Sequence, residues 1–375
     1  MSRTGEHLYQ LVQAYAALGE HRTGTPVDQA TIAWFATELG KRGARVDKVP
    51  YRFERYVANC RLMAHAAEVD ALPLYYEAVG KVNSSRLHLA ELAINANLPG
   101  NSIAPQLDEV GARARMSGAD AAILATSGAG GRLVALNRAP VLGSGFPTVL
   151  VPGSALPMLR QAAVHLELDA RLEPSESATV IGHLGQGAAA PPVVLATSLS
   201  GWFRCAGERG TGMAIALQLA KELAERWPVM VVGTTGHELH YLGLRRFLAT
   251  HALHPSAVIF LGAGLATTTL GPESGSTFAG YRLARTTAGE GLAKRLEGVL
   301  APARFPVRSN PAQWSGEGEE WVRLGTPLLS LASRFPLFHT PQDLPEHSTS
   351  PEQLEVTHTA VNRAAQLFLE ESLRD

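Results

Sequence analysis

The feature that most constrains this chain of 375 residues is a repeated order of short apolar strand, loop and helix in its second half. Strands that are apolar on both faces need helices on both sides of the sheet. The pattern therefore predicts a doubly wound, mostly parallel but mixed sheet with helices on both faces. We expect strands at 192–196, 229–232, 257–261 and 327–331, and helices at 213–223, 237–250 and 351–373.

The first half of the chain divides into two parts. Apolar residues at helical spacing predict a helix at 6–18. Thr25 as a cap and Pro26 at the first helical position predict a second helix, which Gly40 and Gly43 end, followed by a strand at 46–56. Beyond it, glycine-rich turns separate strand-like runs at 121–124 and 147–151 from a helix-like segment at 155–163. We predict a core domain of residues 1–57 and 179–375 with a smaller, mostly β insertion at 58–178.

Composition excludes several classes of protein. Lys and Arg number 33 against 34 Asp and Glu, so the chain has no basic surface for nucleic acid or an anionic membrane. Two cysteines cannot build a disulfide framework or a cysteine-rich zinc site. No apolar run reaches the length of a membrane helix, and the first residues do not resemble a signal peptide. We expect a cytoplasmic protein with a small-molecule or peptide substrate, which could form a homo-oligomer.

Polar residues gather in the loops that follow the predicted strands. In sheets of this kind the ligand site lies beyond the carboxyl ends of the strands. The loops there contain Ser198, Ser200, Trp202, Cys205, Glu208, Arg209, His237, Glu238, His240, His339 and Asp343.

These loops resemble those of the M28 family of zinc aminopeptidases and of its relative, glutaminyl cyclase. The family has H-x-D after a strand, D-N-x-x-G before a helix, E-E-x-G-L-x-G, a later aspartate, and Y-H-T-x-x-D. The order and spacing match over 179–375, and residues 1–56 resemble the N-terminal helix pair of the family. The resemblance implies a zinc-exopeptidase-like core. The insertion resembles a protease-associated domain at 118–123 and 146–149.

The chain departs from the family at most of the chemical positions. Ser198-Leu199-Ser200 stands for H-x-D, and alignment on Gly212 puts Glu208 at the bridging aspartate. His237 replaces the glutamate that is the general base, and Gly262 replaces the later aspartate. The second glutamate and the final histidine remain, as Glu238 and His339.

The resemblance implies one metal site in place of two. Glu208, Glu238 and His339 would bind a single zinc or other divalent ion, and three ligands with an open position suit a catalytic zinc. His237 could be the base, because imidazole titrates near neutral pH. Further catalytic candidates are the two serines, and the substrate-binding candidates are His240, Trp202, Arg209 and Glu317.

Each candidate also has a purely structural interpretation. Glu208 could form an exposed ion pair with Arg209, and Glu238 could sit at a helix start because of the dipole. His237 and His240, three residues apart, would share a helix face and could cap or pack there. Glu317, with its acidic neighbours Glu319 and Glu320, could lie in a solvated loop, and Cys205 could fill apolar space.

Three functions therefore stand as hypotheses. The first is an atypical hydrolase that acts on an amide or peptide-like small substrate with one divalent metal or none. The second is an inactive pseudo-peptidase that serves as a binding scaffold. The third is a metal-independent hydrolase that pairs Ser198 or Ser200 with His237 or His339, although no G-x-S-x-G motif is present. Aminoacyl nitroanilides are expected to be poor substrates.

Overall fold

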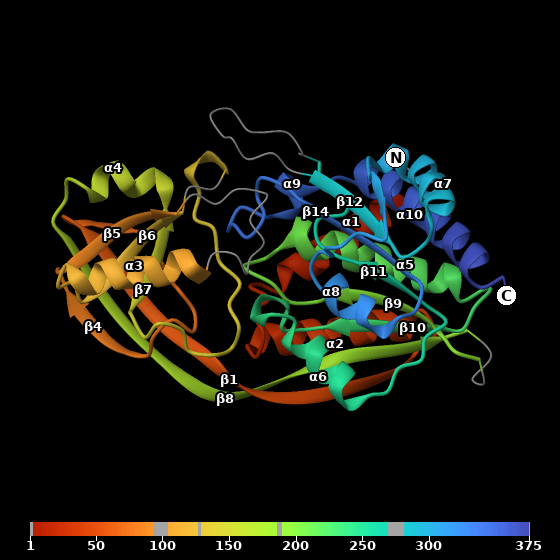
Figure 1. The fold of residues 1–375 in the computed structure, drawn as a ribbon, viewed down its shortest axis with the longest axis horizontal. Helices are drawn as coiled ribbons and strands as arrows, with labels where there is room; N and C mark the ends of the chain where they lie inside the picture. The colour runs from red at the N-terminus through yellow and green to blue at the C-terminus, as the bar shows by residue number, and fades with distance from the viewer. Residues whose placement is uncertain (1–2, 93–103, 127–128, 186–189, 269–280, 375) are drawn as a thin grey trace.

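A mixed sheet of ten strands is the largest feature of the computed structural model, which describes residues 3–92, 104–126, 129–185, 190–268 and 281–374 (Figure 1). Its strands are β1 Arg45–Ala64, β2 Ala67–Val69, β4 Gly80–Ser84, β8 Val164–Leu184, β9 Val193–Ser198, β10 Val229–Thr234, β11 Ala257–Leu261, β12 Tyr281–Thr286, β13 Val307–Ser309 and β14 Leu328–Arg334.

The centre of this sheet is parallel. The order is β13-β12-β14-β11-β9-β10-β8-β1-β2, and β4 also pairs with β8. Strands β14, β11, β9 and β10 are parallel neighbours, whereas β8 and β12 pair with them antiparallel. The carboxyl ends of the four central strands therefore meet at one end of the sheet.

Helices cover both faces of the sheet, as the sequence predicts. The helices of the described residues, in both parts of the molecule, are α1 Arg3–Ala17, α2 Pro26–Lys41, α3 Ala104–Met116, α4 Leu156–Leu159, α5 Thr211–Leu223, α6 Leu242–Thr250, α7 Glu290–Leu300, α8 Gly318–Trp321, α9 Pro345–Ser348 and α10 Pro351–Ser372. The predicted architecture, a mixed and mostly parallel sheet between helices, is confirmed.

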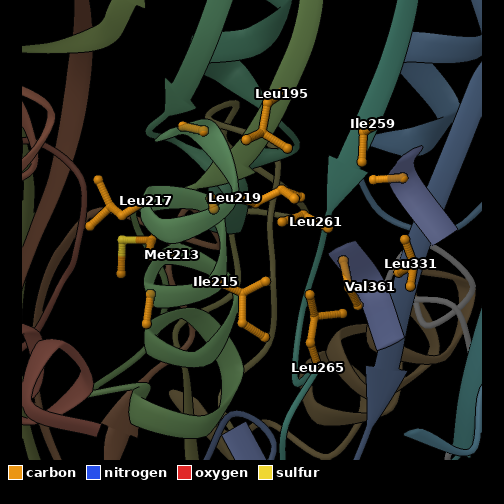
Figure 2. Close-up of a cluster of buried hydrophobic side chains, with 14 of the residues drawn as sticks. Leu195, Met213, Ile215, Leu217, Leu219, Ile259, Leu261, Leu265, Leu331 and Val361 are labelled. Carbon is orange, nitrogen blue, oxygen red and sulfur yellow. The ribbon is translucent and has the colours of Figure 1, made fainter. Parts of the chain in front are cut away.

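Alternate residues of each central strand face opposite cores. Leu195 and Ile259 pack with α1, α2, α5, α7 and α10 on one face (Figure 2). Val194 and Val258 pack with Phe247 of α6 and with α8 on the other. Both faces are apolar because both are covered.

The predicted start of α2 is confirmed by its cap. The Thr25 hydroxyl accepts a hydrogen bond from the Asp28 backbone at the start of α2, and Pro26 is its first residue. The predicted helix at 237–250 is broken instead. A 3₁₀ turn at His237–Leu239 is followed by His240 and Tyr241 in left-handed conformation, and α6 begins at Leu242. His237 and His240 therefore do not share a helix face.

A second, smaller sheet lies at the other end of the molecule (Figure 1). It has the order β3-β7-β6-β5, formed by β3 Leu72–Pro73, β5 Leu87–Leu92, β6 Ala121–Thr126 and β7 Thr148–Pro152. Helix α3 packs on it, an element that the sequence analysis did not anticipate. Strands β1 and β8 form one long antiparallel ribbon that runs from this part into the main sheet. Because the ribbon passes through residues 58 and 178, the domain boundaries stay predictions.

None of the helices in the described parts of the chain is long and apolar enough to cross a membrane.

We predict that Leu195→Ala lowers the free energy of unfolding by about 2–5 kcal/mol, because it leaves a cavity in the core of Figure 2. The control is Val356→Ala, since Val356 on α10 is 42% exposed and its truncation changes stability by less than about 1 kcal/mol. Urea unfolding followed by circular dichroism measures both. Equal losses in the two variants would contradict the assignment of this core.

Candidate active site

Side chains from three loops meet beyond the carboxyl ends of the central strands. Ser198 ends β9 and lies opposite Thr234, which ends β10. The loop after β9 enters α5 through a π-helical turn at Ala206–Gly210, and the loop after β10 contains a 3₁₀ turn at His237–Leu239. The third loop follows β14 and contains His339. The site therefore lies at the end of the sheet that the sequence predicts.

A buried ion pair between Glu208 and Arg209 forms the centre of this site. Arg209 Nη2 is 2.7 Å from Glu208 Oε1, and the two side chains are 1% and 0% exposed. Arg209 Nε also donates to the backbone oxygen of Ser200 at 2.9 Å. The expected pairing of Glu208 with Arg209 is thus present, but it is buried and not exposed. Such a pair is fixed in place, because either charge alone would be costly to remove from water.

The loop that carries this pair depends on close backbone contacts. Cys205 adopts a left-handed conformation with φ of 31°, and its carbonyl accepts hydrogen bonds from the two backbone N–H groups of Arg209 and Gly210. A Cβ at Gly207 would lie 2.8 Å from Asp343 Oδ1, so glycine is required there. Asp343 accepts from the backbone N–H groups of Gly207 at 2.7 Å and Glu208 at 3.0 Å.

Asp343 is therefore a site residue to which the sequence analysis assigned no role. Its only sequence signal is its position four residues after His339 in the family motif. Burial raises the pKa of Asp343 to about 7.

His339 approaches Glu208 from the third loop. Its Nε2 is 3.3 Å from Glu208 Oε1, and its φ of 60° is left-handed. Burial by itself raises the pKa of Glu208, but the charges of Arg209 and His339 outweigh burial and lower this pKa to about 2. Glu208 is consequently an ionised carboxylate at neutral pH.

The carboxylate of Glu238 has a different set of partners. Its Oε1 accepts from the backbone N–H of Thr23 at 2.8 Å, and its Oε2 accepts from the Ser200 hydroxyl at 2.8 Å. The Ser200 oxygen in turn accepts from the N–H groups of Gly236 and His237. Glu238 and Ser200 thus join the N-terminal loop to the turn that holds His237. Like Asp343, Thr23 is a site residue that sequence reasoning missed; it binds Glu238 through its backbone N–H.

The three predicted metal ligands do not form a metal site. Over the parts of the chain that the structure describes, no group of three His, Cys, Asp or Glu side chains could hold a metal ion. Glu208 is paired with Arg209, and both oxygens of Glu238 accept hydrogen bonds from protein donors. The described residues therefore give no support to a site of one zinc on Glu208, Glu238 and His339, which stays a prediction. A guanidinium group lies against the carboxylate that was expected to bind the ion.

His237 lies between a serine and a buried glutamate. Its Nδ1 is 3.3 Å from Ser198 Oγ and 3.2 Å from Glu317 Oε1. Glu317 Oε2 accepts from the Thr234 hydroxyl at 2.7 Å. Burial and then the charge of Arg209 lower the pKa of His237, against the opposing effect of Glu317. The imidazole is therefore neutral at pH 7.

Glu317 does not lie in a solvated loop. Its side chain is 0% exposed, and its role in substrate binding stays a prediction. Its neighbour Glu320 pairs with Arg245 and Arg323, so the acidic cluster of the sequence is divided between two environments.

Two other predicted substrate-binding residues have mainly packing contacts. Trp202 is 2% exposed, stacks on Tyr75, and donates from Nε1 to Asn137 Oδ1 at 2.8 Å. The Arg22 guanidinium lies over both rings. His240 is half-buried and stacks on Tyr241. Trp202 thus joins the core to the insertion, and the substrate role of His240 stays a prediction.

A segment of the predicted insertion without helix or strand, residues 133–138, covers the site. The Ala135 backbone N–H donates to the His339 carbonyl at 2.9 Å, and the Arg138 N–H donates to the Glu238 carbonyl at 3.0 Å. The Ala135 carbonyl is 3.0 Å from His339 Nδ1. Arg138 is also held within the insertion by an ion pair with Glu77. This covering segment therefore fixes both loops that carry the site histidines.

Comparison with known proteins gives the fold and no more. No family model matches the chain, and no curated protein matches it. Among solved structures, it is similar to BSAP, a zinc aminopeptidase from Bacillus subtilis, with a TM-score of 0.73, 16% identity, and coverage of 96% of this chain and 94% of that one.

Two further solved structures lead to the same conclusion. A peptidase M28 precursor from Shewanella amazonensis matches with a TM-score of 0.72, 16% identity, and coverage of 97% and 92% of the two chains. Glutaminyl cyclase from Porphyromonas gingivalis matches with a TM-score of 0.51, 12% identity, and coverage of 96% and 97%. The chain therefore has an M28-like fold, as the sequence resemblance implies.

We predict a pH effect from Asp28, which packs beneath the Thr23 loop. Its Oδ2 accepts from Gly24 N and Ser177 Oγ, and burial raises its pKa to about 7 from 3.8. Between about pH 4 and pH 7 the folded carboxyl holds a proton that the unfolded chain releases. The free energy of unfolding of the wild type should therefore fall with rising pH relative to that of Asp28→Asn.

Urea unfolding of both proteins at pH 5 and pH 8 measures this difference. Asn keeps an oxygen for the two donors of Asp28 but cannot titrate. A difference in stability that is the same at both pH values would contradict the raised pKa.

Proposed function

We propose that this chain is a metal-independent hydrolase that acts on an amide or another carbonyl compound of peptide-like size. The observation that carries the proposal is the contact of 2.7 Å between Arg209 Nη2 and Glu208 Oε1 inside the protein. The family resemblance implies a metal-binding carboxylate at the position of Glu208. In this chain the positive charge beside Glu208 is the guanidinium group of Arg209 and not a metal ion.

Arg209 has the chemistry to polarise a carbonyl group. Its guanidinium stays charged at all relevant pH values. Its Nη1 is buried and has no hydrogen-bond partner among the described residues. A buried donor without a partner is costly, and a carbonyl oxygen of a substrate would remove that cost. The interaction would strengthen as the oxygen gains negative charge in the transition state, which is the condition for catalysis.

His237 supplies the base in this proposal. Because its imidazole is neutral at pH 7, it can take a proton from water while the water oxygen forms a bond to the carbonyl carbon. The resulting oxyanion is stabilised by Arg209. When the bond from carbon to the leaving nitrogen or oxygen breaks, the leaving group takes the proton back from His237. The products are a carboxylic acid and an amine or alcohol.

We predict that hydrolysis of p-nitrophenyl esters and N-acyl amino-acid amides persists in EDTA and falls at least about 100-fold in Arg209→Asn. The same variant should lose about 3–5 kcal/mol of stability, because it leaves Glu208 buried without its partner. Arg209→Lys keeps the charge and should retain more stability and activity than Arg209→Asn.

The matched control is Arg204→Asn, since Arg204 is an exposed arginine of the same loop and its removal should change neither quantity. Steady-state rates and urea unfolding measure the two effects. Activity that EDTA abolishes and zinc restores would refute a metal-independent mechanism.

A second candidate function is a pseudo-peptidase that binds a peptide-like ligand without cleaving it. The observation in its favour is burial of the site beneath the covering segment, with Glu208 and Arg209 at 0% and 1% exposure. In a thermal-shift experiment with a dipeptide library, this candidate predicts ligands that raise the melting temperature and are recovered intact. The hydrolase predicts that stabilising dipeptides are recovered as cleaved products.

The serine-dependent hydrolase has less support from the geometry. Ser200 Oγ is engaged with Glu238 and with two backbone N–H groups. Ser198 and Glu317 both approach Nδ1 of His237, whereas a catalytic serine and its acid contact opposite nitrogens of the ring. We therefore assign neither serine as the nucleophile.

A further inference from the structure

We infer that Glu317 is a positioning residue that fixes His237 in the tautomer a general base requires, an inference that rests on the proposed function. Glu317 Oε1 lies 3.2 Å from His237 Nδ1, and the glutamate side chain is 0% exposed. Within the described residues, His237 is the basic side chain at ion-pair distance from this carboxylate.

The fold holds Glu317 at this place from two sides. Thr234, the last residue of β10, donates its hydroxyl to Oε2 at 2.7 Å, so the second oxygen cannot turn away without losing a bond. Gly318 allows the first turn of α8 to pack closely on β14, since a Cβ there would be 2.9 Å from Ser330 Oγ. The carboxylate is thus directed at the imidazole by a strand end and a close helix contact.

This arrangement decides which ring nitrogen carries the proton. A carboxylate at Nδ1 accepts the hydrogen bond of an Nδ1–H group, which leaves Nε2 without a proton and able to act as a base. Ser198 Oγ, at 3.3 Å from the same nitrogen, can share that hydrogen but does not compete for Nε2. When Nε2 takes up a proton, the adjacent carboxylate stabilises the imidazolium ion.

The alternative is that Glu317 only contributes to packing. If Glu317 only packed, its removal would not change the His237 tautomer. In that case Glu317→Asp, which keeps the acid but shortens the side chain, would not restore a property that Glu317→Gln loses. These two differences define the experiment.

The experiment uses full-length protein with ¹⁵N-labelled histidine and compares wild type, Glu317→Gln, Glu317→Asp and the control Glu320→Gln. Glu320 is a buried acid of the same helix that pairs with Arg245 and Arg323, away from His237. Nitrogen chemical shifts give the His237 tautomer without any turnover, and ester hydrolysis is measured on the same samples. Circular dichroism confirms that each variant is folded.

We expect the Nδ1–H tautomer in wild type and Glu320→Gln, and its loss in Glu317→Gln with a fall in hydrolysis of at least about 100-fold. Glu317→Asp should restore the tautomer and part of the rate. An unchanged tautomer in Glu317→Gln, or an Nε2–H tautomer in wild type, would overturn the inference. If the tautomer changes as expected but no protein hydrolyses any substrate, the proposed function fails and the positioning role stands.

Discussion

The buried contact of Arg209 with Glu208 determines how the loops at the end of the sheet can be arranged. A carboxylate with no exposed surface needs a cation or hydrogen-bond donors beside it, and for Glu208 the next residue in the chain provides the cation. The pairing lowers the pKa of Glu208 to about 2 despite its burial. Burial lowers the pKa of His237, and the charge of Arg209 lowers it further. Burial and this ion pair therefore act together on the pKa values of Glu208 and His237.

The remaining contacts hold this pair in place. Asp343 binds the backbone of the Glu208 turn, and the Ser200 carbonyl binds the Arg209 side chain. Glu238, at a position where the family resemblance implies a metal ligand, instead links Ser200 to the N-terminal loop. The carboxylate of Glu238 is thus satisfied by protein donors, whereas both oxygens of Glu208 and Nη1 of Arg209 have no hydrogen-bond partner among the described residues. The M28-like fold is thus kept, with the Arg209 guanidinium at the place where the family resemblance implies a metal ion.

Much of this architecture could be predicted from sequence, because apolar strands such as β9 and β11 and capped helices such as α2 follow local rules. The position of the site at the end of the sheet could also be predicted from sequence, but the contacts between its side chains could not. Arg209 and Glu208 are adjacent in sequence, yet only the tertiary structure shows that they are buried together. Glu317 and His237 are far apart in sequence, and no local pattern marks their contact. The break at His240 depends on left-handed backbone that helical spacing does not reveal.

The most direct test of the account is a crystal structure of the wild-type protein grown with zinc chloride, with anomalous data collected at the zinc edge. We predict that the Arg209 guanidinium lies against Glu208 and that no anomalous peak lies between Glu208, Glu238 and His339. A zinc peak bound by these three side chains, with Arg209 displaced, would contradict it.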